Sequence, residues 1–189
     1  MGLREIITGR RKLAGPAPDR LFAITTANVT FETLGLTPDG TAAVVFQALD
    51  TADFGATVRD MEQLVRATAE DSGTVVETSD DSFGFRWLVL RGGALDDLVV
   101  GIHAVGAAIE SGGYGDRLLC AVFAFVDAHG HPTYWIYNFK RGAFYPFVPA
   151  SGEQQRDTER ELVLKAQIGA ELPIEAELER WFPLWGTPI

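Results

Sequence analysis

The sequence contains a single cysteine, Cys120, among its 189 residues. One thiol cannot form an intramolecular disulfide, and this usage is typical of proteins from a reducing compartment. The chain also lacks a run of about 18 to 20 apolar residues, the length that a membrane-spanning helix needs. Its first residues lack the apolar core of a secretory signal. We therefore expect a cytoplasmic protein that folds without a disulfide.

Positive charge is also scarce. The sequence has 16 Lys and Arg residues against 26 Asp and Glu residues, and its formal net charge is −10. Proteins that bind nucleic acid usually carry a basic stripe that neutralises phosphates, so we expect no nucleic-acid partner. The exception is the start of the chain, where residues 1–20 hold five basic and two acidic side chains. The sequence therefore predicts a basic arm on an acidic body.

Side chains suited to catalysis are few and scattered. Cys120 lies within the most apolar segment, where burial keeps a thiol protonated and unreactive. His129 and His131 share one turn with Asp127, too crowded an arrangement to supply the three or four ligands of a zinc site. We expect no catalytic residue, cofactor or metal. The alternative is a pocket near His103 that binds a small ligand or serves an enzyme.

The spacing of apolar residues predicts an α+β fold. Three- and four-residue spacings indicate helices over 53–69, 94–111 and 153–168. Short β-branched or apolar runs indicate strands over 41–48, 74–78, 83–91, 118–126 and 133–139, with an edge segment at 144–147. Tight turns between the later strands favour antiparallel pairing. We expect one antiparallel sheet with helices packed mainly on one face.

The chain divides into two parts by composition. Residues 1–17 form a basic arm and a linker rich in alanine, glycine and proline, and residues 18–189 form a single α+β domain. The arm has two interpretations. It is either a basic tail or a weak membrane contact, which would place the protein at the inner face of the membrane. The residues of that candidate contact are Leu3, Arg4, Ile6, Ile7, Arg10, Arg11 and Lys12.

Aromatic residues gather in the C-terminal third, next to positive charge. Large apolar rings are usually core residues. Protein interfaces, however, are enriched in Trp, Tyr and Arg at their centres. The sequence therefore suggests a candidate partner surface that comprises Lys140, Arg141, Phe144, Tyr145, Trp181, Phe182 and Trp185.

Four segments carry a distinctive pattern: 81–90 (DSFGFRWLVL), 118–123 (LLCAVF), 140–147 (KRGAFYPF) and 180–186 (RWFPLWG). Together with the basic start of the chain, they resemble the PspAB family of PspA-associated proteins. This family is linked to the phage-shock envelope-stress system. The resemblance implies an accessory role beside PspA, a membrane-associating coiled-coil stress protein. It also implies a functional neighbourhood with an HtpX-like membrane protease, and it brings no catalytic residue.

The leading hypothesis is thus a non-enzymatic adaptor that binds a stress-response partner, a PspA-like protein, through its aromatic and basic surface. An acidic body would help to steer it toward basic segments of that partner. A second hypothesis is a homo-oligomer, specifically a dimer that resembles secretion chaperones, since small acidic α+β proteins often present a sheet or helix to a client. The third is the pocket near His103.

Overall fold

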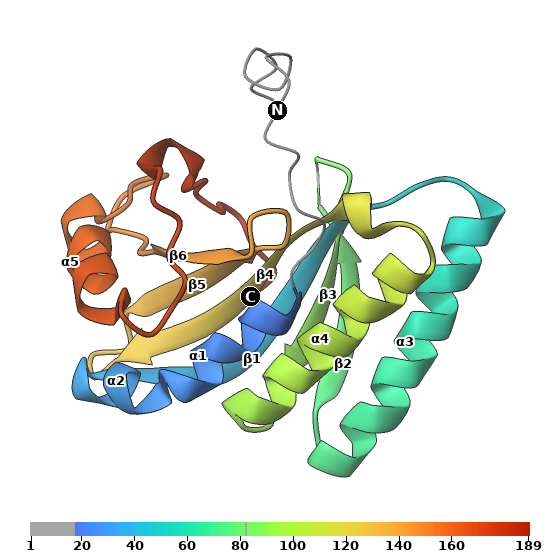
Figure 1. The fold of residues 1–189 in the computed structure, drawn as a ribbon, viewed down its shortest axis with the longest axis horizontal. Helices are drawn as coiled ribbons and strands as arrows, with labels where there is room; N and C mark the ends of the chain where they lie inside the picture. The colour runs from blue at the N-terminus through green and yellow to red at the C-terminus, as the bar shows by residue number, and fades with distance from the viewer. Residues whose placement is uncertain (1–17, 82) are drawn as a thin grey trace, which may run out of the picture.

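A computed structural model describes residues 18–81 and 83–189. Its centre is one six-stranded antiparallel sheet with the strand order β2-β3-β1-β4-β5-β6 (Figure 1). The strands are β1 (Leu36–Gln47), β2 (Val75–Asp80), β3 (Phe85–Arg91), β4 (Leu118–Asp127), β5 (Pro132–Asn138) and β6 (Ala143–Phe147). The helices are α1 (Ala23–Thr26), α2 (Asn28–Thr33), α3 (Ala52–Ser72), α4 (Leu95–Ser111) and α5 (Thr158–Ile168). Short 3-10 turns span Pro18–Phe22, Gly115–Arg117 and Leu178–Arg180.

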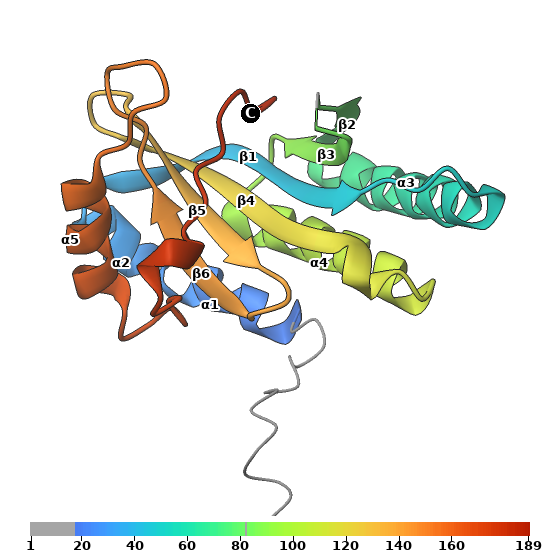
Figure 2. The same ribbon diagram turned by 90° about the horizontal axis from the view of Figure 1, so that it is seen from above.

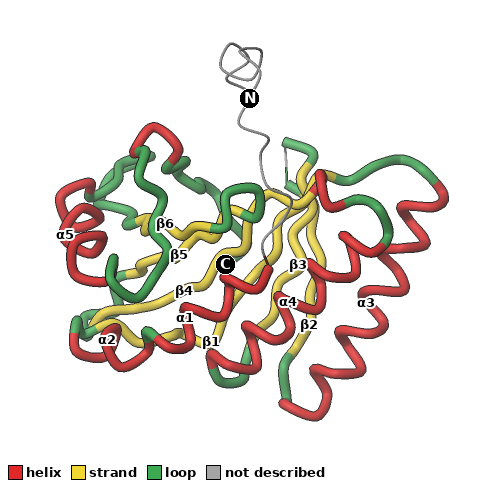
Figure 3. Tube along the Cα trace, in the orientation of Figure 1, coloured by secondary structure: helices red, strands yellow, loops and turns green. Residues whose placement is uncertain are grey.

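The helices lie mainly on one face of the sheet. Helices α1 to α4 cover that face, and α5 lies beside the β6 edge (Figures 1 and 2). Figure 2 shows the C-terminal segment crossing the opposite side of the sheet, the helix-free face. Figure 3 gives the view of Figure 1 with helices in red, strands in yellow and loops in green. The expected α+β fold is confirmed. The predicted membrane-contact arm, from Leu3 to Lys12, lies outside the described residues.

Strand β1 begins earlier than the sequence predicted, because the Pro38-Asp39-Gly40 segment is a bulge and not the end of an element. The register between β1 and β4 shifts after Pro38. The Asp39 carboxylate accepts a hydrogen bond of 2.8 Å from the Thr41 N–H, and Gly40 has a φ of 83° that favours glycine. The chain therefore changes register here and stays in the sheet.

Helix α5 begins five residues later than predicted. The Asp157 carboxylate accepts a hydrogen bond of 2.9 Å from the Arg160 N–H and so caps the first turn. Residues 149–156 form a loop that is closed by a bridge between Pro149 and Arg156. Sequence periodicity missed this boundary because the loop is as polar as the exposed side of the helix.

Alternation along the strands divides the core into two layers. Side chains such as Val44, Phe46, Leu88 and Phe123 face the helices. They pack against the predicted stripe of α4, whose members Leu95, Leu98, Ile102, Val105 and Ile109 are all buried. Their strand neighbours form a second cluster on the helix-free face, which includes Val45, Trp87, Cys120 and Val122. Both faces of the central strands are therefore apolar, as in a fully buried sheet.

Gly101 provides a test of how closely α4 packs on the sheet. A Cβ at this position would overlap the side chain of Leu90 in β3. Helix propensity alone favours Gly101→Ala by about 1 kcal/mol, whereas overpacking a buried contact costs about 1–3 kcal/mol. We expect Gly101→Ala to lower the free energy of unfolding by about 1 kcal/mol in urea titrations. Gly55→Ala in α3, where the new Cβ meets only Arg59 at 3.4 Å, should raise the free energy of unfolding. An equal increase in both variants would contradict the close packing of α4 on the sheet.

Candidate interaction groove

A groove opens on the helix-free face of the sheet. Its volume is about 980 Å³, and it lies between the C-terminal segment and the turn that joins β2 to β3. Its apolar lining consists of Val45, Phe83, Phe85, Trp87, Leu119, Cys120, Tyr145, Phe182, Pro183, Leu184, Trp185 and Gly186. Its polar lining consists of Asp81, Asn138, Lys140 and Gln154. This size and predominantly apolar lining are typical of binding sites.

The floor of the groove is one row of residues across four strands. Trp87 pairs with Val45, Val45 pairs with Cys120, and Cys120 pairs with Asn138. Residues paired in this way place their side chains on the same face of a sheet. The groove therefore crosses the strands, from β3 at one end to β5 at the other.

Exposed phenylalanine rings stand on two sides of this floor. Phe83 belongs to the turn between β2 and β3 and is 78% exposed, and Phe182 belongs to the C-terminal segment and is 62% exposed. They are the two most exposed Phe, Tyr or Trp residues in the described part of the chain. Trp185 has a different position, since its ring packs edge-on against Phe147 with 4.9 Å between centroids. The groove thus combines fixed aromatic walls with two rings that are free to contact a partner.

The wall formed by the β2–β3 turn is held by Asp81. Its carboxylate accepts hydrogen bonds from the N–H groups of Phe83 (2.8 Å) and Phe85 (2.9 Å), and from Trp87 Nε1 (3.0 Å). Burial acts to raise the pKa of Asp81, but these hydrogen bonds, led by that of Trp87, outweigh it and lower the pKa. The carboxylate is therefore ionised at neutral pH, and it is engaged by hydrogen bonds from its own hairpin.

The opposite wall, residues 182–189, is held by side chains. Tyr145 donates its O–H to the Phe182 carbonyl at 3.2 Å, and Arg91 Nη2 donates to the Pro188 carbonyl at 2.6 Å. In the described part of the chain, no backbone-to-backbone hydrogen bond involves residues 182–189. The segment therefore depends on these side-chain contacts and on apolar packing for its position.

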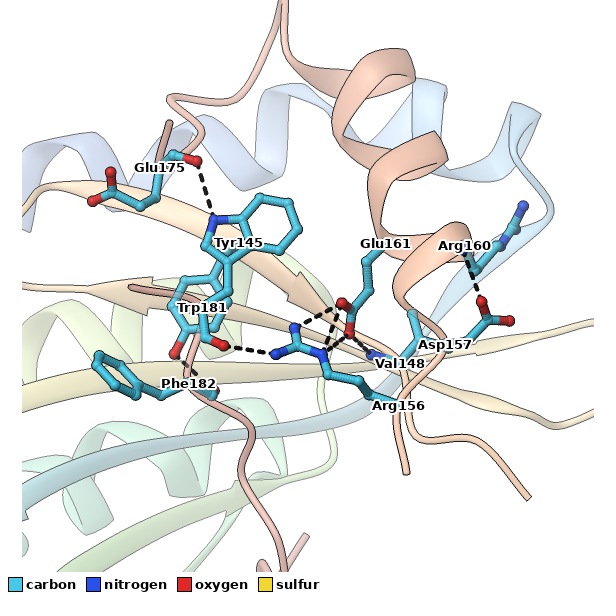
Figure 4. Close-up of polar contacts among 9 residues, drawn as sticks. All are labelled: Tyr145, Val148, Arg156, Asp157, Arg160, Glu161, Glu175, Trp181 and Phe182. Atoms are coloured by element: carbon cyan, nitrogen blue, oxygen red, sulfur yellow. Dashed lines mark hydrogen bonds and ion pairs between the residues drawn. The ribbon is translucent and has the colours of Figure 1, made fainter. Parts of the chain in front are cut away.

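Immediately before this wall, Trp181 is fixed by a buried ion pair (Figure 4). Arg156 donates from Nη1 to the Trp181 carbonyl at 2.7 Å, and its Nη2 lies 2.7 Å from Glu161 Oε2. Glu161 also accepts the Val148 N–H at 2.9 Å. Burial raises the pKa of Glu161, although the hydrogen bonds from Arg156 and Val148 oppose this rise. Arg156 thus joins α5 to the C-terminal segment.

A second ion pair fixes the same region from the β5–β6 turn. Arg141 Nε lies 2.9 Å from Glu175 Oε2, and the Glu175 carbonyl accepts a 3.1 Å hydrogen bond from Trp181 Nε1. Burial acts to raise the pKa of Glu175, but hydrogen bonds from the Glu177 N–H and from Arg141 outweigh it and lower the pKa. Arg141 is therefore engaged within the protein.

The structure brings four of the seven residues of the predicted partner surface together at the groove, and their role in binding a partner stays a prediction. Lys140, Tyr145, Phe182 and Trp185 all line the groove. The expectation that Phe144, Tyr145 and Trp181 are exposed is wrong, because all three are buried. Strand alternation turns Phe144 toward the helix-side core, while Tyr145 faces the groove and stacks on Trp181 with 6.1 Å between centroids.

Sequence reasoning missed the contribution of the β2–β3 hairpin. Phe83, Phe85 and Trp87 lie two residues apart, a spacing that places them on one face. This spacing predicts the strand over 83–91, but it does not indicate which face of the strand is open to a partner. Nothing in the local pattern indicated that residues 182–186 would lie across from them and form a groove.

The candidate catalytic residues lie in separate places. Cys120 forms part of the groove floor, and burial raises the pKa of its thiol to about 12. The His103 ring packs against Phe22 at 5.1 Å, and it lines neither this groove nor a second cavity of about 450 Å³ between α3 and α4. His131 Nδ1 contacts the Asp127 carboxylate at 3.1 Å. The absence of a catalytic residue and of a cofactor stays a prediction.

The described residues show neither a metal-binding cluster nor a membrane-spanning helix. Within residues 18–81 and 83–189, no group of three or more His, Cys, Asp or Glu side chains is arranged to hold a metal ion. In the same residues, no helix combines the length and the apolar character needed to cross a bilayer.

These features define an α+β protein with one sheet and an apolar groove on its helix-free face. Comparison with protein families gives a match along the whole chain, residues 1–189, to the family described as PspA associated protein B. The chain belongs to this PspAB family, and the resemblance seen in the sequence is confirmed. The description of the family supports an accessory role associated with PspA. Searches of curated proteins and of solved structures gave no match.

The ion pair that fixes the C-terminal segment can be tested by removing one charge. Glu161→Gln leaves the Arg156 cation without its partner in a buried position, and we expect a loss of about 3 kcal/mol in unfolding free energy. Asp80→Asn is the matched control, because Asp80 forms an equally short but exposed pair with Arg86 (2.7 Å). The control should lose less than about 1 kcal/mol. Equal losses in urea titrations would contradict the structural role of Arg156 and Glu161.

The environment of Cys120 predicts slow alkylation. With a pKa of about 12, the thiolate fraction at pH 8 is about a thousandfold lower than for a free cysteine. We expect iodoacetamide to react with the folded chain about a thousandfold more slowly than with the urea-unfolded chain. The rate should rise about tenfold per pH unit from pH 7 to 10. A rate that levels off near pH 8.5 in the folded protein, measured by mass spectrometry, would contradict this environment.

Proposed function

We propose that this chain is a non-enzymatic cytoplasmic adaptor of the PspA envelope-stress response, and that it binds a PspA-like protein directly through the groove. One observation carries the proposal: two highly exposed phenylalanine rings, Phe83 and Phe182, belong to walls of the same apolar groove. The family description supports PspA as the partner. The geometry of the groove supports it as the contact surface.

Exposed aromatic rings beside an apolar groove have a physical use in binding. A ring that is free in the monomer and buried in a complex removes apolar area from water, at about 25 cal/mol per Å². Such residues usually dominate the energy of an interface when they enter a well-packed centre. Here the floor and the Trp185 wall are already fixed, so little order must be gained on binding.

The proposal predicts which side chains contribute to affinity. Phe83→Ala and Phe182→Ala should each weaken binding of the PspA-like protein of the same organism by about tenfold, because each removes a ring buried in the complex. Leu64→Ala is the matched control, since Leu64 in α3 is an apolar side chain that is 57% exposed and does not line the groove. Isothermal titration calorimetry with purified proteins measures all three.

The other hypotheses give different results in the same experiment. No heat of binding with the wild-type chain at two well-separated temperatures would refute direct contact with a PspA-like protein, because apolar burial changes the heat capacity even where its enthalpy is near zero. An HtpX-like protease in detergent is then the next partner to titrate. Sedimentation of the chain alone tests the dimer that resembles secretion chaperones. Equal affinities for Phe83→Ala, Phe182→Ala and Leu64→Ala would place the binding surface elsewhere.

A further inference from the structure

The groove changes in character along its length. At the β3 end, its floor and walls are aromatic, with Phe85 and Trp87 beside Val45. At the β5 end, the floor row finishes at Asn138, and Lys140 follows in the turn after β5. A ligand that lies along the floor would therefore meet apolar surface first and polar donors last.

The two charged groups of the lining differ in their availability. The Asp81 carboxylate already accepts three hydrogen bonds from Phe83, Phe85 and Trp87. In the described part of the chain, Lys140 forms no ion pair or hydrogen bond. Its neighbour Arg141 contrasts with it, since Arg141 lies 2.9 Å from Glu175. The charge of the groove that is free for a ligand is thus the Lys140 ammonium.

Gln154 adds an uncharged group to the same lining. It is the one non-glycine residue with a positive φ, 52°, in the described part of the chain, and its side chain forms no hydrogen bond there. The Asn138 side chain accepts the Arg141 N–H through Oδ1 at 3.2 Å, which leaves its amide N–H₂ group without a partner in the described residues. Both amides and Lys140 therefore offer donors, which suit an anionic acceptor.

We infer that the groove binds a segment of the PspA-like partner in which a run of apolar side chains ends at an Asp or Glu residue. The apolar side chains lie over Trp87, Val45 and Cys120, and the carboxylate meets Lys140. This inference rests on the proposed function and adds the chemistry and direction of the bound segment. A charge-assisted hydrogen bond beside an apolar floor is stronger than one in open water.

The test combines affinity with chemical cross-linking. Lys140→Met keeps the apolar stem and removes the charge, and we expect it to weaken binding of the PspA-like protein by about tenfold. It should also reduce the salt dependence of the affinity. Arg59→Ala is the control, because it removes the same net charge from an exposed position on α3. A carbodiimide, which joins contacting amines and carboxylates, should link Lys140 to one acidic residue of the partner, identified by mass spectrometry.

The outcomes separate this inference from the proposed function. If the wild-type chain binds, Phe83→Ala weakens binding and Lys140→Met does not, the groove is the site but the carboxylate contact is refuted. The same conclusion follows if the Lys140→Met variant binds with wild-type affinity and the carbodiimide links the wild-type complex only at residues other than Lys140. If the wild-type chain does not bind the PspA-like protein, both proposals fall together. Binding that weakens in Lys140→Met and Phe83→Ala, but not in Arg59→Ala, supports both.

Discussion

The sheet of this protein has two apolar faces, and the helices cover only one of them. The second face carries Val45, Trp87, Cys120 and Val122, all of which would be exposed on an uncovered sheet. Leaving such a surface in water is unfavourable and promotes association. The C-terminal segment covers much of it, and the part left open is the groove. The position of this segment therefore determines both the stability of the second face and the shape of the candidate site.

Residues 182–189 make no backbone-to-backbone hydrogen bond in the described part of the chain, so Tyr145, Arg91 and apolar packing hold them. The residue before them, Trp181, is held by two ion pairs with buried carboxylates, one between Arg156 and Glu161 and the other between Arg141 and Glu175. Both act on Trp181, through its carbonyl and through a hydrogen bond from its indole N–H. A buried ion pair is often no more stabilising than apolar side chains of similar volume, but removal of one partner is costly because it leaves an uncompensated charge. Here the two pairs fix the point from which residues 182–189 cross the sheet.

The same arrangement separates structural from interacting aromatic residues. Trp181 and Tyr145 are stacked and buried, and Trp185 packs on Phe147. Phe83 and Phe182 are the rings left exposed at the groove. The basic pair of the β5–β6 turn is divided in the same way, since Arg141 is paired internally and Lys140 is not. The proposed binding role is thus assigned to a few side chains on a rigid support, as in many protein interfaces.

The sequence by itself determined the α+β class, the hairpins, the α4 stripe and the buried state of Cys120, because these follow from periodicity over neighbouring residues. It missed the bulge at Pro38 and the late start of α5, which depend on single hydrogen bonds made by Asp39 and Asp157. Only the tertiary structure decided which aromatic residues are exposed. Phe83 and Phe182 are about a hundred residues apart, and their placement on walls of the same groove depends on how the C-terminal segment crosses the sheet. Such a long-range arrangement leaves no local pattern, since packing and not spacing along the chain determines it.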